Sequence, residues 1–485
     1  MDKDIDLKHF LEVEQKYNLY EDTIEGIHYW VYSRFIIWED FIIKPQLNLG
    51  KAHSNKELKL SEKAEIFFKL VKNCIINPNK RKRNVDILFV SHPRRVLNNG
   101  VYECIYTDKL AKEFENYAVY EQPYQWQHLE PTDTANMIYG DSTLLKKGLY
   151  LVLYKTVYKG KYADLLKKIE GKISQPLKEI ESRYGFSLDR KQIVHSIAMQ
   201  IIFYKASIKD IQKMLTRLNP KVVVEVVGYN PFCMLINEAC RRKKIPTIEL
   251  QHGIMNKHMG YEYKSQNRIR QFPNKIFLFS EFWKNQIHIP VNEKNLIATG
   301  YPYFERKLHE AKVIQEYIDG KINILFISQG TIGTKLSELA YELSTIMDLD
   351  KYRIFYKLHP GEFDIWEDAY VKLKDSNVIV IKGNDYSLYD YFSTCQIQVG
   401  VYSTALYEGL GFGIRTYIYK IEMAGYMQEL NDAGYIKYFE SAKELYENIN
   451  ENVNENVMME NNKTDFWKVN ALENMVGEIK NIIIN

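Results

Sequence analysis

Residues 221–253 read KVVVEVVGYNPFCMLINEACRRKKIPTIELQHG and decide the fold class. The β-branched run at 221–227 is too short for a helix and predicts a buried parallel strand. A helix expected at 231–243 and a second strand at 247–250 complete a βαβ unit. Gln251-His252-Gly253 follows that second strand. Ligands of open α/β sheets bind at the carboxyl ends of strands, so this tripeptide is a candidate site.

Strands and helices of the same kind are expected on both sides of this unit. An apolar run at 85–90 predicts the first strand of an N-terminal domain, and further strands are expected at 275–279 and 296–299. In the second half, helices alternate with strands expected at 322–327, 353–358, 378–381, 396–399 and 416–419. Such alternation predicts parallel sheets with helices on both faces.

The first 80 residues follow another pattern. Their apolar residues recur at three- and four-residue spacings, which predicts helices. A chain of 485 residues is too long for one ordinary core. We therefore expect an α/β protein with an N-terminal helical segment (1–80) and two Rossmann-like domains (81–305 and 306–485) whose parallel sheets face a cleft.

The composition excludes several classes of protein. Hydrophobic residues make up 46% and charged residues 26%, as in folded proteins, and the net charge of +3 does not argue for a nucleic-acid partner. Five scattered cysteines without a CxxC pair predict neither a disulfide framework nor a zinc site, and they indicate a reducing cytoplasm. No signal peptide and no membrane span are expected.

Basic residues cluster at 80–83 and at 241–244. One interpretation is that they are solvated helix ends and linkers, as short charge runs usually are. The alternative is attraction to an anionic acceptor or to the inner face of a membrane, which would make the protein peripheral there.

His252 is the first candidate catalytic residue. A histidine at the carboxyl end of a strand can act as a general base near neutral pH, and Gly253 permits close approach of a ligand. Gln251, Lys257 and His258 add polar groups around it and are interpreted as acceptor-side residues. The alternative is a structural histidine at a domain boundary.

A second histidine follows a strand in the other half of the chain. Lys357-Leu358-His359-Pro360-Gly361 ends that strand, and Pro360 fixes the turn. His359, with Lys357 nearby, can then hydrogen-bond a phosphate oxygen. The alternative is a helix N-cap or turn residue without a ligand.

Small hydroxyl residues mark two further loops of the second half. Ser403 and Thr404 open a helix, whose N-terminus attracts anions, although simple capping is the alternative. Glu408, one turn later, is placed to accept hydrogen bonds from a ribose. Gly330 and Thr331 lie in another turn from strand to helix and could wrap a phosphate.

Several motifs are absent. The chain has no Walker A sequence and no GxGxxG after its first strand, which argues against a P-loop enzyme and a dinucleotide dehydrogenase. Asp348-Leu349-Asp350 precedes a strand, at the wrong end of the sheet for a catalytic metal. We therefore expect neither a metal nor a cofactor. His92, after the first strand, is a further candidate for the cleft.

At these residues the chain resembles GT-B glycosyltransferases of bacterial surface polysaccharide synthesis. His359-Pro360 and Ser403-Thr404 are similar to the two motifs that hold the CMP phosphate in bacterial sialyltransferase-like enzymes. His252-Gly253 looks like the His-Gly segment of CDP-glycerol polyol-phosphate transferases, and Glu408 looks like the ribose-binding acid of many GT-B folds. The resemblance covers roughly residues 85–420.

The chain departs from the sialyltransferase pattern at the base. No Asp/Glu-Asp/Glu-Gly motif is present in the first domain, so Glu225 or His252 would have to serve. The resemblance also implies that the last helix packs back on the first domain.

The expected function is metal-independent transfer of a sugar from a nucleotide-activated donor, with a CMP-sugar favoured, to a hydroxyl of a glycan or glycolipid acceptor at the cell surface. The alternatives are a CDP-glycerol-type polyol-phosphate transferase, a nucleotide-sugar 2-epimerase and a non-catalytic scaffold. The sequence leaves the oligomeric state open.

Overall fold

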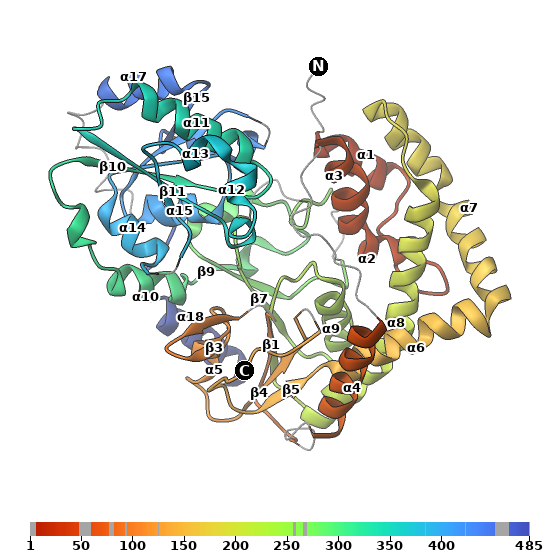
Figure 1. The fold of residues 1–485 in the computed structure, drawn as a ribbon. Helices are drawn as coiled ribbons and strands as arrows, with labels where there is room; N and C mark the ends of the chain where they lie inside the picture. The colour runs from red at the N-terminus through yellow and green to blue at the C-terminus, as the bar shows by residue number, and fades with distance from the viewer. Residues whose placement is uncertain are drawn as a thin grey trace.

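Two parallel sheets, one in each half of the chain, form the framework of the protein (Figure 1). The computed structural model describes residues 6–47, 60–76, 82–92, 95–124, 126–255, 259–264, 269–383, 385–421, 423–451 and 465–484. The arrangement has the two Rossmann-like sheets that the alternation of strands and helices predicts.

The first sheet has seven parallel strands in the order β5-β4-β1-β6-β7-β8-β9. Its central strands β1, β6 and β7 are buried throughout because helices cover both faces. The strands are β1 (Ile87–Ser91), β4 (Tyr117–Glu121), β5 (Met137–Tyr139), β6 (Val222–Val226), β7 (Thr247–Leu250), β8 (Lys275–Leu278) and β9 (Leu296–Ala298). A small antiparallel pair, β2 (Val96–Asn98) and β3 (Val101–Glu103), follows β1.

The second sheet has six parallel strands in the order β12-β11-β10-β13-β14-β15. The strand order reverses direction at β10, between β11 and β13, and such a point is where open α/β sheets bind ligands. The strands are β10 (Ile322–Ile327), β11 (Tyr352–Lys357), β12 (Ile379–Ile381), β13 (Ile397–Gly400), β14 (Arg415–Tyr419) and β15 (Ile436–Phe439).

Helices surround both sheets. In the first half they are α1 (Leu7–Lys16), α2 (Tyr29–Ile36), the π-helix η1 (Ile37–Ile43), α3 (Lys44–Leu47), α4 (Leu60–Ile76), α5 (Asp108–Ala111), α6 (Asp141–Thr156), α7 (Lys159–Tyr184), α8 (Arg190–Leu218) and α9 (Pro231–Arg242). In the second half they are α10 (Pro302–Glu310), α11 (Gly333–Ile346), α12 (Trp366–Ala369), α13 (Val371–Lys374), α14 (Leu388–Thr394), α15 (Thr404–Gly411), α16 (Gln428–Asp432), α17 (Ala442–Glu451) and α18 (Ala471–Ile484). Short 3-10 turns are η2 (Glu281–Gln286), η3 (Glu293–Asn295), η4 (Gln315–Tyr317), η5 (Pro360–Glu362) and η6 (Ala424–Met427).

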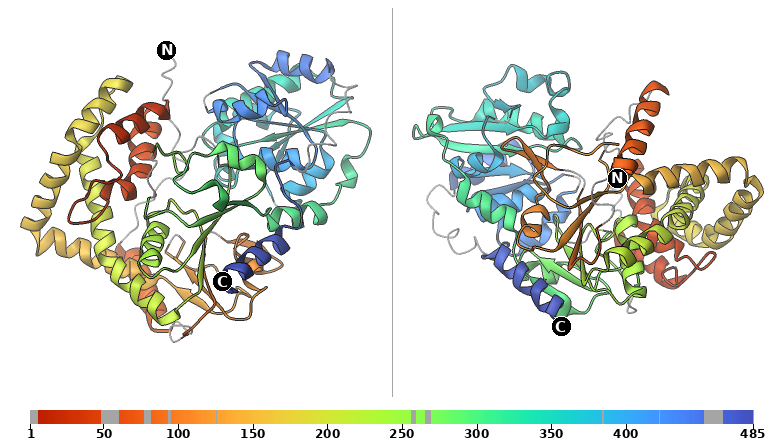
Figure 2. Two further views of the ribbon diagram at one scale, coloured as in Figure 1. Left: turned by 180° about the vertical axis from the view of Figure 1, so that it is seen from behind. Right: turned by 90° about the horizontal axis from the view of Figure 1, so that it is seen from below.

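The N-terminal helices pack on the long helices α7 and α8, beside the first sheet (Figure 2). The interface between them is apolar, and Phe10, Trp30 and Ile197 are buried in one core that continues to the first sheet. A buried ion pair lies within this core: Arg34 donates from Nε to Glu14 Oε1 at 2.7 Å and from Nη2 to Glu14 Oε2 at 2.8 Å.

The same guanidinium binds the segment after the His252 loop. Arg34 donates to the carbonyl oxygens of Met259 (2.8 Å) and Glu262 (2.9 Å), and it lies 3.9 Å from the centroid of the Tyr263 ring. The buried guanidinium of Arg34, with four hydrogen bonds, therefore connects the N-terminal segment to residues 259–262.

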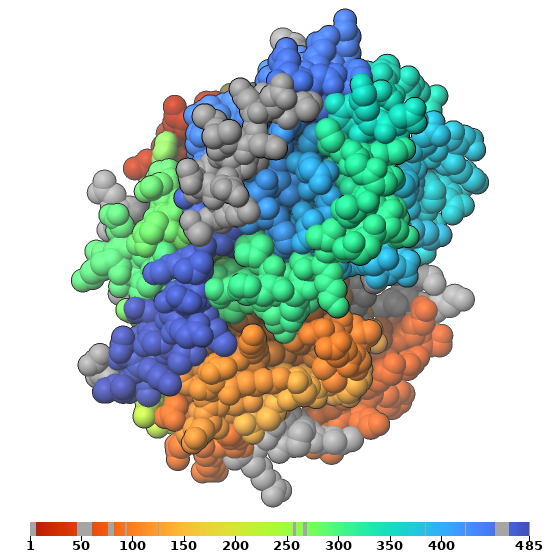
Figure 3. Space-filling model, turned by 90° about the vertical axis from the view of Figure 1, so that its left-hand side faces the viewer, coloured from red at the N-terminus to blue at the C-terminus, as the bar shows by residue number. Residues whose placement is uncertain are grey.

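The C-terminal helix α18 packs against the first domain (Figure 3). Its Met475 and Ile479 are buried in the core of β1 and β6. The chain reaches α18 past Gly300, which has a φ of +104° and whose added Cβ would lie 2.3 Å from the Lys468 carbonyl oxygen. Only glycine fits at this crossing.

The strands expected from the sequence lie within one or two residues of the observed ones. Five observed strands are not among those expected: β4, β5 and β15, which lie towards the edges of the two large sheets, and the small antiparallel pair of β2 and β3. Between β11 and β12 the chain forms two short helices, α12 and α13, separated at Tyr370. No helix in the described part of the chain is both long and apolar enough to cross a membrane.

We predict that Arg34→Met destabilises the protein by about 3–5 kcal/mol, because Glu14 would remain buried without its cation. Urea denaturation followed by circular dichroism measures this as a shift of the first transition. Arg183→Met is the matched control: Arg183 pairs with Glu12 and Glu179 at the surface, where such pairs contribute about 1 kcal/mol or less. Equal shifts in the two variants would contradict the prediction.

Candidate functional site

The loop after β7 is held rigidly at the carboxyl edge of the first sheet. Gln251 is buried, its Oε1 accepts from the Phe279 backbone N–H (2.7 Å), and its Nε2 donates to the Gly253 carbonyl (2.9 Å). The Tyr106 hydroxyl donates to the His252 carbonyl at 2.7 Å. These bonds fix the backbone on both sides of the His252 ring.

Two tyrosines flank the imidazole of His252. The Tyr261 hydroxyl lies 3.2 Å from Nδ1, and the Tyr229 hydroxyl lies 3.4 Å from Nε2. Tyr261 also donates its proton to Glu249 Oε1 at 2.8 Å. Because the Tyr261 O–H is committed to Glu249, its oxygen accepts from Nδ1–H, and Nε2 retains its lone pair.

Glu249 anchors this chain of hydrogen bonds. It is fully buried on β7, and the same Oε1 accepts from the Gly228 backbone N–H at 2.9 Å. Burial raises the pKa of Glu249 to about 7, while the bonds from Gly228 and Tyr261 oppose the rise. The arrangement is a carboxyl–hydroxyl–imidazole relay, a geometry that can orient a histidine for proton transfer.

Glu225 is next to Glu249 in the sheet, but its hydrogen bond to Asn237 is made outside this relay. It pairs in register with Glu249 on β6, but its Oε1 accepts from Asn237 Nδ2 of helix α9 at 2.6 Å. Burial and the neighbouring Glu249 raise its pKa well above the usual range. Its side chain is inaccessible, which does not favour the role of base predicted for it.

The second half brings a helix N-terminus to the His252 loop. Ser403 caps α15, accepting from the Ala405 backbone N–H at 3.2 Å. A Cβ added to Gly253 would lie 3.3 Å from Thr404 Oγ1. The carboxyl edges of the two sheets therefore meet where β7 and β13 end, which brings Gly253 of one half beside Thr404 of the other.

His359 begins a turn, as the capping alternative describes. Its Nδ1 accepts from the Gly361 backbone N–H at 3.1 Å, and Glu362 Oε2 accepts from the His359 backbone N–H at 2.6 Å. Pro360 is the first residue of η5. Because Nδ1 is the acceptor, the proton of the neutral ring is on Nε2, which can donate to a phosphate.

Lys357 ends β11 just before this turn, and Gly330 and Thr331 follow the neighbouring strand β10. Lys357 donates to the Gly383 carbonyl at 3.1 Å, and burial lowers its pKa. Thr331 Oγ1 lies 2.9 Å from the Tyr402 hydroxyl, which ties the Gly330–Thr331 turn to the loop that opens α15. Gly330 itself is exposed.

Glu408 is hydrogen-bonded to a tyrosine of the second half. It is almost fully buried on α15, and the Tyr389 hydroxyl donates to its Oε1 at 3.2 Å. Burial raises the pKa of Glu408 to about 7, against the hydrogen bond from Tyr389.

Of the remaining predicted residues, His92 packs edge-on against Tyr106, with ring centroids 6.0 Å apart. It is thus one ring away from His252. Lys257 and His258 lie outside the described residues.

The N-terminal segment adds a carboxyl group that the sequence did not single out. Phe35 packs on Tyr229 with centroids 4.7 Å apart, and Glu39 follows on the π-helix η1. Burial is the largest cause of the raised pKa of Tyr229, Tyr402 and Tyr426, and it brings the pKa of Tyr426 to about 12. The negative charge of Glu39 adds to the rise at each of the three tyrosines. Glu39 therefore lies near tyrosines of both halves.

Sequence reasoning missed Glu249, Tyr261 and Tyr229. The available signal was the pair of carboxyls inside strands that are apolar on both faces, since a buried carboxyl requires a hydrogen-bonding partner. Within the described residues, no group of three or more His, Cys, Asp or Glu side chains could hold a metal ion.

A buried charge network borders the site at the ends of β1 and β4. Arg95 pairs with Asp108 and Glu121, and His128 bonds Glu121 Oε1 (2.8 Å) and Asp141 Oδ2 (3.0 Å). Burial alone would lower the pKa of His128, but the bonds to Asp141 and Glu121 outweigh it and raise the pKa to about 9.

Comparison with known proteins gives a fold and no sequence family. No family model matches the chain, and no curated protein matches it by sequence. The UDP-GlcNAc 2-epimerase of Methanocaldococcus jannaschii is similar in structure, with a TM-score of 0.50 and 11% identity over 81% of this chain and 99% of that one.

Two other solved structures are more distantly similar. The wall teichoic acid polymerase TagF has a TM-score of 0.43 and 10% identity, covering 88% of this chain and 98% of that one. MurG of Acinetobacter baumannii has a TM-score of 0.40 and 14% identity, covering 57% and 78%. The two parallel sheets and the likeness to the epimerase give this chain a GT-B fold, as predicted.

We predict that the network makes stability depend on pH through His128. A histidine whose folded pKa is raised stabilises fully below its unfolded pKa of about 6.5, and this contribution is lost as pH rises through about 9. The free energy of unfolding of the wild type, measured by urea denaturation, should fall between pH 6.5 and 9.5 by up to about 3 kcal/mol. His128→Gln should flatten this dependence, and an unchanged slope in the variant would count against it.

Proposed function

We propose that the protein is a glycosyltransferase that moves a sugar from a nucleotide-activated donor to an acceptor hydroxyl. The observation that carries the proposal is the approach of Thr404 to Gly253, which joins a base from one sheet to an anion-binding helix N-terminus from the other. The donor phosphate would lie against α15 and His359, and the acceptor beside His252.

In this mechanism His252 Nε2 takes the proton of the acceptor hydroxyl as its oxygen attacks the anomeric carbon. The bond between that carbon and the phosphate oxygen breaks, and the nucleotide leaves with the electron pair. The free N–H groups of α15, Ser403, Thr404 and His359 stabilise the growing charge on the phosphate. These groups supply the stabilisation that a metal gives elsewhere, so we propose a metal-independent reaction.

The other candidates have supporting roles. Glu249 and Tyr261 position His252, and Glu225, buried beneath α9, takes no part in proton transfer. Glu408 would bind the ribose, with Lys357, Gly330 and Thr331 near the phosphates. Gln251 and Gly253 shape the acceptor side, where His92, Lys257 and His258 are also placed by the proposal.

The identity of the donor rests on motifs. His359-Pro360 and Ser403-Thr404 favour a CMP-sugar, and the His252-Gly253 pattern keeps a CDP-glycerol-type transfer as an alternative. The acceptor would be a glycan or glycolipid of a bacterial surface polymer, capsule or lipopolysaccharide, which places the enzyme in the cytoplasm.

A second candidate function is epimerisation at C2 of a nucleotide sugar. It is favoured by the structural similarity to a UDP-GlcNAc 2-epimerase over nearly the whole of that protein. Incubating the protein with UDP-GlcNAc alone separates the two functions, because an epimerase isomerises the free nucleotide sugar whereas a transferase needs an acceptor.

We predict that replacing His359 weakens nucleotide binding, whereas replacing His252 lowers turnover. Titration calorimetry with CMP, CDP, UDP and GDP should find one tight nucleotide, and His359→Ala should weaken it about tenfold or more by removing a hydrogen bond to a charged phosphate. His252→Ala, the matched control, should bind the nucleotide normally but lose about 10²–10⁴-fold in turnover. Failure of all four nucleotides to bind would reject the transferase and favour a scaffold.

A further prediction concerns the relay. Tyr261→Phe removes the hydroxyl between Glu249 and His252, so kcat should fall about 10- to 100-fold while KM for the donor changes little. The pH profile of kcat should shift as well, because the base loses its oriented partner. Tyr389→Phe removes a hydroxyl from the Glu408 side and should instead change donor KM. Identical kinetic effects of the two variants would contradict the assigned roles.

A further inference from the structure

Basic residues from three separate segments meet at the opposite edge of the first sheet. Arg83 precedes β1, Arg217 closes α8 before β6, and Lys243 follows α9 before β7. They are therefore at the amino ends of these strands, whereas His252 is at the carboxyl end of β7. The basic clusters at 80–83 and 241–244 are far apart along the chain, but each contributes a residue to this edge of the sheet, Arg83 and Lys243.

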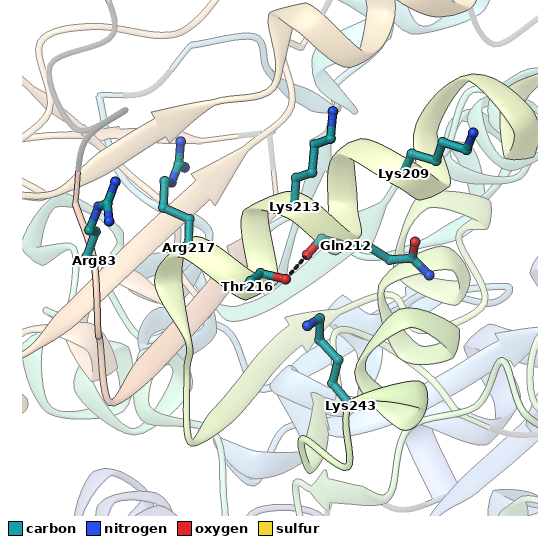
Figure 4. A pocket seen from close by; sticks show the side chains of 7 residues that line it. All are labelled: Arg83, Lys209, Gln212, Lys213, Thr216, Arg217 and Lys243. Carbon is teal, nitrogen blue, oxygen red and sulfur yellow. Dashed lines mark hydrogen bonds between the residues drawn. The ribbon is translucent and has the colours of Figure 1, made fainter.

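These residues line an open hollow of about 800 Å³ (Figure 4). Lys209, Lys213 and Arg217 project from one face of α8, and the guanidinium groups of Arg83 and Arg217 lie beside each other. Lys243 enters from the other side and points towards α8. Five cations and no carboxylate line the hollow.

The positive charge of the hollow is not compensated by the protein. Among the described residues, none of the five cations forms an ion pair with a carboxylate, and Asp210, next to Lys209 in sequence, is paired with Lys146 instead. The Nε of Arg217 is buried without a hydrogen-bond partner. Burial and the charge of Arg83 lower the pKa of Arg217, so the charged form is disfavoured there.

Attraction to the C-terminal end of a helix explains only two of the five cations. Arg217 and Lys243 are at the C-terminal ends of α8 and α9, where the helix dipole favours positive charge. Lys209, Lys213 and Arg217 are spaced by four residues, however, and like charges at that spacing destabilise a helix. Arg83 comes from outside both helices. The arrangement costs stability unless an anion occupies it.

We propose that this hollow binds clustered phosphate groups, at a site separate from the cleft. Guanidinium groups bind phosphate oxygens in pairs, and the lysines supply further positive charge from both sides. The phosphates could belong to the headgroups of an anionic membrane or to a soluble polyphosphate. Both sources offer the same chemistry, and the experiment below separates them.

The test uses the full chain with Lys213→Glu and Lys243→Glu combined. Binding to tripolyphosphate is measured by calorimetry, and binding to phosphatidylglycerol-containing vesicles, with phosphatidylcholine vesicles as reference, by co-sedimentation. The matched control combines Lys167→Glu and Lys191→Glu, exposed lysines on α7 and at the start of α8 with the same change in charge. Thermal midpoints verify that both variants are folded.

We expect the hollow variant to bind one of the two probes at least about tenfold more weakly than the wild type, and the control to bind it normally. The binding should weaken as salt is added. Loss of vesicle binding identifies a membrane, and loss of tripolyphosphate binding identifies a soluble ligand. Wild-type binding of neither probe, or equal losses in hollow variant and control, overturns the proposal. Nucleotide binding at the cleft should be unchanged in the hollow variant, so the outcome is independent of the proposed transferase.

Discussion

The geometry of the candidate site depends on one buried guanidinium, that of Arg34. A cation removed from water must have its donors satisfied, and Arg34 achieves this by pairing with Glu14 and by binding the carbonyls of Met259 and Glu262. Those carbonyls are on both sides of Tyr261, whose hydroxyl connects Glu249 to His252. The N-terminal helices are therefore part of the site's framework, because the orientation of the base follows from their packing.

A second constraint is the aromatic junction between the two halves. Trp467 stacks on Phe304 at 4.2 Å and packs against Phe279 at 5.1 Å, while Trp283 packs against Tyr407 at 4.9 Å. Domains move relative to one another unless a large apolar interface joins them. These ring contacts join the two halves on one side, so any movement of one half relative to the other must pivot about this junction.

The sequence was sufficient for the framework but not for the relay. Strands such as β6 and β7 are short, β-branched and buried on both faces, so the local pattern alone identifies them. The edge strand β5 has only three residues and no such pattern. His252 is identifiable from the sequence because a predicted strand ends there. The hydrogen bonds of Arg34 to Met259 and Glu262, 225 and 228 positions away, are tertiary contacts that no local pattern encodes. The same holds for the approach of Thr404 to Gly253.

Tyrosine hydroxyls, which carry no charge, contact both His252 and Glu408. Tyr106, Tyr229 and Tyr261 contact His252, and Tyr389 contacts Glu408. Burial raises the pKa of Tyr229, Tyr261 and Tyr389, so they remain protonated donors at any working pH. Neutral hydroxyls contact the imidazole and the carboxyl without adding negative charge beside them. In the proposed reaction the charge of the nucleotide is met by the N-terminus of α15 and by His359, whereas the five cations of the hollow lie at the far edge of the first sheet.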